Sequence, residues 1–310
     1  MPTVHGLHHV TAIAGPAQEN LDFYAGRLGM RLVKRSVNQD DPGTYHLFYA
    51  DAAGSPGTDL TFFPWARMAP ARPGTGLALE VQLAVPPGSL GFWAERLGDL
   101  AGPTEERFGE RLLPLRDPHG LPLALVETEP PPGRPTLPWE RSQVPGEFQV
   151  SGLHGARISV RDLGPTAELL ALLGYAEVGT ESGWHLFALP GGGSGRTLEV
   201  AEDPGAPRGM WGTGGIHHLA FRVADDAHEA EVSAAVAAAG LRPTPVIDRF
   251  WFRSVYFKEP GGVLFELATD GPGFAVDEDP SALGERLVLP PWLEPDRAEI
   301  ESALPVLTLP

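Results

Sequence analysis

The segments GLHHVTAI (residues 6–13) and GIHHLAF (residues 215–221) lie in opposite halves of the chain, yet each opens an apolar run with glycine and two adjacent histidines. The whole chain of 310 residues contains ten histidines, so two such pairs at matching places are unexpected. Both runs have the short, apolar, β-branched and aromatic character of a buried strand. This coincidence predicts that one structural unit occurs more than once in the sequence.

The similarity extends downstream of the histidine pairs. Residues 44–63 and 184–203 each indicate an apolar strand, a glycine-rich turn and a second strand, and both contain the string HLF. The segments ahead of them indicate a strand, a loop and an amphipathic helix that ends at Leu-Gly, where glycine can take a left-handed conformation. The same order recurs after residue 214 and more faintly after residue 77. We therefore predict an α+β fold of four βαβββ modules in two tandem halves.

The boundaries of these parts follow from the pattern. The predicted modules cover residues 6–66, 77–128, 151–203 and 214–270. The first two modules form an N-terminal half, residues 1–130, and the last two form a C-terminal half, residues 151–275. The proline-rich residues 131–150 have no periodicity and are predicted to link the halves. Residues 276–310 form a proline-punctuated tail with one short helix near Pro295–Ala303, which we expect to wrap around the body.

The composition limits the classes of function. With 42% hydrophobic and 20% charged residues, the chain is typical of a globular protein. The absence of cysteine excludes disulfides, thiolate metal sites and a cysteine nucleophile. A formal charge of −17 opposes binding to nucleic acid or anionic membranes. We find neither a basic and apolar leader nor a run near the roughly 20 apolar residues of a membrane span, so we expect a cytoplasmic protein.

The histidine pairs offer metal ligands. Adjacent residues of a strand face opposite sides, so only one histidine of each pair can point into a given cavity. The face with His9 and His218 continues with the small residues Thr11 and Ala220, whereas the face with His8 and His217 continues with apolar residues suited to lie beneath a helix.

A carboxylate completes this candidate site. Glu266 interrupts the apolar run of the last strand of the fourth module, where an unpaired charge would be costly to bury. Together with His9 and His218 it makes the two-histidine, one-carboxylate set that is typical of non-haem Fe(II), with positions left open for substrate and oxygen.

Alignment of the modules by their glycine turns tests this interpretation. Glu266 aligns with Thr61 in the first module, Ala124 in the second and Glu199 in the third, and the histidine position aligns with Gly155 in the third. The first and fourth modules together thus supply three ligands, and we predict one metal in the cavity that they share. Glu199 has no assigned role at this stage. His46, His119 and His185 stand in strands or turns without evident partners and are interpreted as structural residues.

The residues quoted so far also carry a family resemblance. The segments GLHHVTAIAGPAQENLDFYAGRLGM, GIHHLAF and DRFWFRSVYFKEPGGVLFELATDGPGF resemble ring-cleaving dioxygenases that act on hydroquinones. These enzymes belong to the vicinal oxygen chelate superfamily, which has the glyoxalase/bleomycin resistance/extradiol dioxygenase fold. The resemblance spans nearly the whole chain.

This resemblance implies a function and a set of site residues. It implies Fe(II), with Mn(II) as an alternative, at His9, His218 and Glu266, and a small aromatic substrate and O2 as the reaction partners. It further implies roles beside the metal or the substrate for five residues, namely His8, Thr11, His217, Arg249 and Tyr256. It leaves a homo-oligomer open.

Other functions are compatible with the same fold. A glyoxalase-like metal-dependent isomerase or lyase needs four protein ligands, and here Thr61 stands at the fourth position. A two-domain catechol dioxygenase builds its site from the second half alone, where Gly155 removes a ligand. A metal-free resistance protein that binds an aromatic or quinone compound is the remaining alternative.

Overall fold

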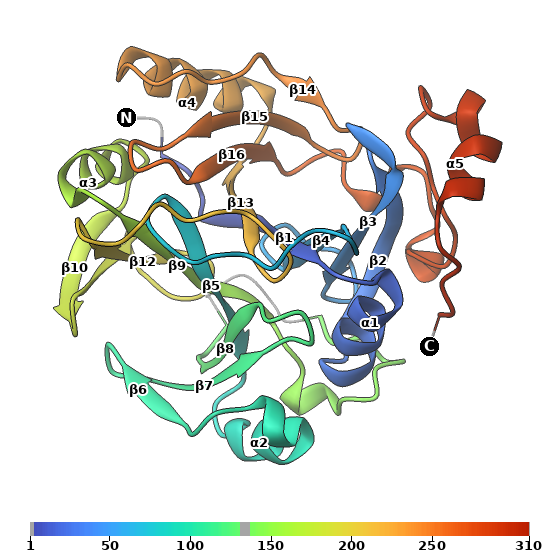
Figure 1. Cartoon of the computed structure of the whole chain (residues 1–310), viewed down its shortest axis with the longest axis horizontal. Helices are drawn as coiled ribbons and strands as arrows, with labels where there is room; N and C mark the ends of the chain where they lie inside the picture. Colours follow the sequence, from blue (N-terminus) through green and yellow to red (C-terminus); the bar gives the residue numbers. More distant parts are fainter. Residues whose placement is uncertain (1–2, 131–136, 310) are drawn as a thin grey trace.

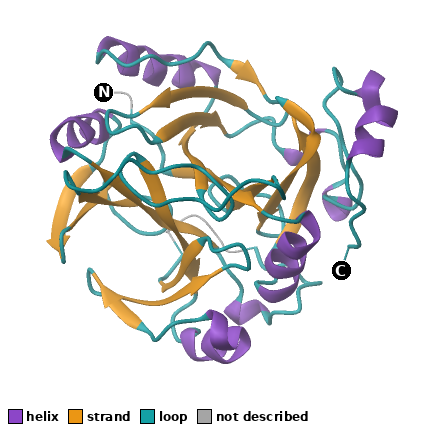
Figure 2. Cartoon of the chain, viewed as in Figure 1, coloured by secondary structure: helices purple, strands orange, loops and turns teal. Residues whose placement is uncertain are grey.

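The computed structural model describes residues 3–130 and 137–309. The described chain contains two curled eight-stranded sheets packed against each other, with short helices around their outer sides (Figures 1 and 2). The linker predicted at residues 131–150 lies partly outside the described residues, because 131–136 are not among them.

The first sheet is built from the two modules that carry histidine pairs. Its strands run in the order β14-β15-β16-β13-β1-β4-β3-β2. Their bounds are β1 (Leu7–Ala14), β2 (Arg31–Asn38), β3 (Asp41–Ala50), β4 (Asp59–Pro64), β13 (Ile216–Val223), β14 (Ile247–Asp248), β15 (Arg253–Lys258) and β16 (Leu264–Thr269). The strands β1 and β13 are antiparallel neighbours at the centre, so the two histidine pairs lie side by side.

The second sheet repeats this arrangement with the other two modules. Its strands run in the order β10-β11-β12-β9-β5-β8-β7-β6. Their bounds are β5 (Leu77–Val85), β6 (Glu105–Arg107), β7 (Glu110–Arg116), β8 (Pro122–Glu127), β9 (Gly152–Val160), β10 (Ala176–Glu181), β11 (Trp184–Ala188) and β12 (Thr197–Glu202). The four predicted βαβββ modules are therefore present, and each sheet takes one module from either half of the chain.

Each module has its helix between its first and second strands. These helices are α1 (Ala17–Leu21), which continues as a π-helical turn (Asp22–Arg27), α2 (Leu90–Leu97), α3 (Leu163–Leu172) and α4 (Asp226–Ala238). Gly29 and Gly174, the glycines of the predicted Leu-Gly ends of the first and third helices, have φ of 67° and 98°. Only glycine takes such angles without strain, which explains why the helices end there.

The core is continuous across the modules. Buried side chains from all four modules form one hydrophobic cluster, with Trp93, Phe62 and Phe221 fully enclosed. Burial of this apolar surface stabilises the packing of the two sheets. None of the helices in the described ranges is long and apolar enough to cross a membrane.

The C-terminal tail packs against the first module, as Figure 1 shows for the segment beside β2 and β3. The remaining helical elements are short: turns over Gly98–Leu100, Gly146–Phe148, Phe274–Val276, Pro280–Ala282 and Glu294–Asp296, and helix α5 (Arg297–Ala303). The hydroxyl of Tyr45 on β3 donates to the carbonyl of Pro305 at 2.9 Å. The buried ammonium of Lys34 on β2 pairs with Asp277 and Glu278 at the start of the tail. These polar contacts hold the tail across the edge of the first sheet.

Candidate metal centre

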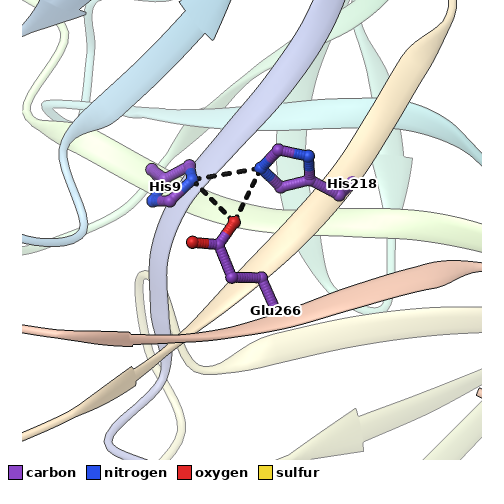
Figure 3. Close-up of side chains that lie close together, drawn as sticks. All are labelled: His9, His218 and Glu266. Atoms are coloured by element: carbon purple, nitrogen blue, oxygen red, sulfur yellow. Dashed lines mark hydrogen bonds and ion pairs between the residues drawn. The ribbon is translucent and has the colours of Figure 1, made fainter. Parts of the chain in front are cut away.

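Three buried side chains converge in the first sheet (Figure 3). Nε2 of His9 on β1 lies 3.2 Å from Nε2 of His218 on β13. Oε2 of Glu266 on β16 lies 3.3 Å from the former and 2.8 Å from the latter. The exposed fractions of the three side chains are 3%, 4% and 0%. Central strands from two modules therefore bring together the three residues that the sequence analysis combined.

The histidine that precedes each of these two histidines lies behind it. Nδ1 of His8 is 2.9 Å from Nδ1 of His9, and Nε2 of His8 is 3.1 Å from the carbonyl oxygen of Thr269. Because a carbonyl only accepts, Nε2 of His8 must donate, and Nδ1 of a neutral His8 must then accept from His9. Burial lowers the pKa of His8 to about 3, so its ring is neutral. Because Nδ1 of His9 is the donor to His8, its Nε2 is the nitrogen left to bind a metal.

The second pair repeats the first. Nδ1 of His217 lies 2.8 Å from Nδ1 of His218. Burial, followed by the charge of His218, lowers the pKa of His217 to about 3. Its ring is stacked on Trp211, with centroids 4.5 Å apart. The two histidine pairs thus have a common arrangement. The second histidine of each pair faces the cluster with Nε2, and the first histidine contacts its Nδ1.

The donor set fits a divalent metal. Burial alone would raise the pKa of Glu266, but positive charge at His9 and His218 holds it well below the ordinary 4.5, so the carboxylate stays charged when a cation lies beside it. Its Oε1 accepts a hydrogen bond from Ser254 on β15, whereas Oε2 accepts none from the described residues. A carboxylate oxygen and imidazole lone pairs that face one another inside a protein repel unless a cation lies between them. Two histidines and one carboxylate are the ligands of non-haem metal sites with open positions.

A narrow cavity opens beside this cluster, and it receives two of the five further residues implied by the sequence. Arg249 and Tyr256 line it. A guanidinium nitrogen of Arg249 donates to Asp40 at 2.9 Å, and its guanidinium carbon lies 5.5 Å from the centre of the Tyr256 ring. The pKa of Tyr256 is raised, first by burial and then by the charge of Glu266, which keeps the phenol protonated. The fourth module therefore contributes a cationic group, Arg249, and a hydroxyl, Tyr256, to the cavity wall.

The other three implied residues do not line the cavity. His8 and His217 lie behind the two histidines, as described above. Thr11 is fully buried two residues after His9, and its hydroxyl lies 2.7 Å from the hydroxyl of Thr61 on β4. These three side chains can act on the cavity only through the residues that they contact.

His46 on β3 was interpreted from sequence as a structural residue, but the structure places it on the cavity wall. Its Nε2 lies 3.0 Å from the hydroxyl of Thr61, and its ring packs on Phe48 and Phe63 with centroid distances of 3.8 and 4.5 Å. Strand alternation carried the missed signal, because His46 and Phe48 share a face of one strand. His119 and His185 lie outside the cavity, near the carboxylates of Glu19 and Glu177.

The second sheet has a counterpart of this site without the ligands. The paired registers of the strands place Glu80 and Gly155 where the first sheet has His9 and His218. Glu199 corresponds to Glu266, and it binds Arg157 through Nε at 2.7 Å and accepts from the amide of Gln82. Glu199, which the sequence left unassigned, is thus neutralised by an arginine of its own sheet.

The chain is similar to known proteins over nearly its whole length. A family model described as the Glyoxalase/Bleomycin resistance protein/Dioxygenase superfamily matches residues 6–178. The candidate ring-cleaving dioxygenase MhqO of Bacillus subtilis is 42% identical over 96% of this chain and 95% of its own length. The chlorohydroquinone/hydroquinone 1,2-dioxygenase of Sphingobium indicum is 33% identical over 96% and 95%.

Solved structures agree on the fold. A candidate dioxygenase of Bacillus subtilis superposes with a TM-score of 0.94 at 40% identity, over 100% of this chain and 99% of that one. Glyoxalase I of Zea mays superposes with a TM-score of 0.62 at 14% identity, over 86% and 92%, which is a likeness of fold alone.

Proposed function

The chain belongs to the Glyoxalase/Bleomycin resistance protein/Dioxygenase superfamily and to its ring-cleaving dioxygenases, and on this premise we propose that it opens hydroquinone-type rings with O2 at an Fe(II) ion held by His9, His218 and Glu266. The observation that carries the proposal is the convergence of these three buried donors within 4.8 Å of one another. The full-length similarity to a chlorohydroquinone/hydroquinone 1,2-dioxygenase supports the choice of substrate class.

The residue at the fourth position supports an oxygen-dependent reaction over a glyoxalase-type isomerisation. Thr61 pairs with Thr11 in the same register in which Glu266 pairs with Ala220. A hydroxyl that is already bonded to Thr11 is a poor substitute for a fourth carboxylate ligand. A site with three protein ligands keeps neighbouring positions for a substrate oxygen and for O2. The complete ligand set likewise opposes a metal-free binding protein.

The substrate and O2 balance the reaction, so no further oxidant or reductant is needed. The bond between a hydroxyl-bearing ring carbon and its neighbour breaks, and both atoms of O2 enter the product, one in a carboxylic acid and the other in an aldehyde. Fe(II), when bound, supplies Lewis acidity towards the substrate oxygen and exchanges electrons with O2. Mn(II) has similar ligand preferences and is the alternative metal.

The chain itself supplies orientation, charge and proton transfer. Phe48, Phe63 and Phe252 line the cavity with aromatic surface that packs against a flat ring and excludes water. Arg249 places a positive charge where an oxyanion develops. Tyr256, protonated and beside Arg249, can pass a proton to or from the substrate. We assign His8 and His217 to the orientation of the two histidine ligands, and Thr11 to the orientation of Thr61.

Oxygen uptake tests the proposal. Protein purified without oxygen and loaded with Fe(II) is given hydroquinone, methylhydroquinone and catechol in turn, with His218→Ala as the control. We expect uptake with a hydroquinone and its loss in the variant. If the protein binds one metal per chain and consumes no oxygen with any of the three compounds, the dioxygenase assignment is wrong and an isomerase or a binding protein takes its place.

We further propose that the enzyme acts in the cytoplasm on small aromatic compounds and that it binds neither nucleic acid nor membranes. The charge of −17 opposes binding to nucleic acid and to anionic membranes. Cell fractionation followed by immunodetection tests the location, and light scattering of the purified protein determines whether it forms a homo-oligomer.

A further inference from the structure

We infer that His46 binds the second hydroxyl group of the substrate, the one that is not directed at the metal. This inference rests on the proposed function, since it assumes a hydroquinone in the cavity. It concerns a residue outside the ligand set and outside the five residues implied by the sequence.

The position of His46 allows it to contact a substrate in the cavity. It lies on β3, which is separated from β1 by β4. Neighbouring strands are about 4.8 Å apart, so the backbones of β3 and β1 are roughly 9–10 Å apart. His46 lines the same cavity as His9 and His218 but forms no hydrogen bond with either of them in the described chain. His46 therefore forms part of the wall that a substrate meets in this cavity without being a metal ligand.

The internal symmetry of the sheet shows what is unusual about this residue. Thr61 and Glu266 occupy equivalent registers, and they pair across the strands with Phe48 and Tyr256 respectively. Two residues before these partners stand His46 on β3 and Ser254 on β15.

His46 and Ser254 each contact the residue at the ligand position of the neighbouring strand, but only His46 has a further polar atom left over. Ser254 donates to Glu266 through its single hydroxyl, and His46 contacts Thr61 through Nε2. The imidazole has a second nitrogen, Nδ1, to which the described residues offer no hydrogen-bond partner. The nitrogen in excess is the atom that we assign to the substrate.

The surroundings fix the ring and its charge. Phe48 and Phe63 pack on the imidazole. Burial first, then the charges of His9 and His218, lower the pKa of His46 well below 6.5. Arg249 acts in the same direction and Glu266 opposes it. The ring is therefore neutral, with one N–H and one lone pair, and can pair with a phenolic hydroxyl in either sense.

The opposite wall is less suited to this hydroxyl. Arg249 already donates to Asp40, and its carbonyl accepts from Gln39. Tyr256 faces Arg249 and pairs in register with Glu266, which places it at the metal end of the cavity. His46 thus offers the cavity a ring nitrogen that no described residue binds.

Binding measured without oxygen tests the inference, because no turnover occurs. Dissociation constants of hydroquinone and of phenol, which lacks the second hydroxyl, are measured on metal-loaded wild-type protein and on His46→Leu. Loss of one hydrogen bond between neutral groups corresponds to about a tenfold change in affinity. We expect His46→Leu to weaken hydroquinone binding about tenfold and to leave phenol binding unchanged.

Two further variants separate binding from structure. Thr61→Val removes the partner of Nε2 but keeps Nδ1, so the preference for hydroquinone over phenol should persist. His185→Leu removes a histidine of the second sheet that pairs with Glu177, and both affinities should be unchanged. Metal content and thermal unfolding are measured for every variant to confirm that the site and the fold are retained.

The outcomes distinguish this inference from the proposed function. Equal weakening of hydroquinone and phenol in His46→Leu, or the same change in Thr61→Val, would show that His46 only supports the wall and would overturn the inference. The proposed function would stand in that case if the wild type still consumed oxygen with hydroquinone. A metal-loaded wild type that binds neither compound would refute both.

Discussion

Replacement of Glu229 by glutamine should stabilise the protein at alkaline pH. Glu229 belongs to α4 and is fully buried on the same side of the helix as Val232 and Val236. Neither of its carboxylate oxygens has a hydrogen-bond partner among the described residues. Burial, followed by the nearby charges of Asp226 and Glu266, raises its pKa to about 7. A buried carboxyl without partners is most stable as the neutral acid.

The sign and size of the effect follow from this shift. Because the folded pKa lies above the ordinary 4.5, the folded protein holds a proton that the unfolded chain loses between pH 4.5 and 7. The stabilising effect of that proton is complete below pH 4.5 and is lost as the pH rises through 7. The difference between pKa 4.5 and 7 corresponds to at most about 3 kcal/mol. Glutamine has the same shape and no charge, so it avoids this loss.

Urea unfolding at pH 5 and pH 8 measures the effect. We expect Glu229→Gln to raise the free energy of unfolding by up to about 3 kcal/mol at pH 8 and by little at pH 5. Glu231→Gln, an exposed position of the same helix, should change neither value. Titrations with and without bound metal are compared, because a cation beside Glu266 weakens its repulsion of Glu229. An equal effect of Glu229→Gln at both pH values, or a loss of stability at pH 8, would refute the argument.

Three other predictions concern the two sheets. Substitution His8→Ala removes the group that holds Nδ1 of His9, so the affinity for the metal should fall about 10–100-fold in a competition assay with a chelator; unchanged affinity would show that packing alone orients His9. Substitution Arg157→Met leaves Glu199 without its cation, whereas Glu80 keeps Arg107 at 2.7 Å, and it should lower the free energy of unfolding by about 3 kcal/mol while metal content stays the same; a neutral effect in urea would mean that water replaces the guanidinium. Treatment with a strong chelator should abolish oxygen uptake and lower the melting temperature, and Fe(II) should restore both; activity that survives complete metal removal, checked by elemental analysis, would contradict a metal-dependent reaction.

The repeat explains how much of the fold and the candidate site follows from sequence. Strand alternation, with its period of two residues, separates His9 from His8. Glu266 is distinguished from the other carboxylates because it interrupts an apolar strand, and the alignment of modules by their glycine turns supports that choice. These local rules do not depend on how the modules are arranged. The four modules and the three converging donors were therefore predictable from one sequence.

Contacts between neighbouring strands were not predictable in the same way. The role of His46 depends on the register of β3 against β4, which brings its ring to Thr61. The partner of Glu199 is Arg157, which belongs to another strand and is chosen by the register of β9 against β12. Sequence spacing contains neither register, because the loops that set them vary in length between the modules.

The ion pair of Arg157 and Glu199 gives the second sheet a cation of its own. In the second sheet the positive charge is part of the chain, so it is present as soon as the strands meet. That sheet can form without any metal supply and can provide a folded surface on which the first sheet assembles. The enzyme should therefore persist as a folded, inactive apoprotein when its metal is scarce, and the metal would switch on activity in molecules already made rather than determine how many of them fold.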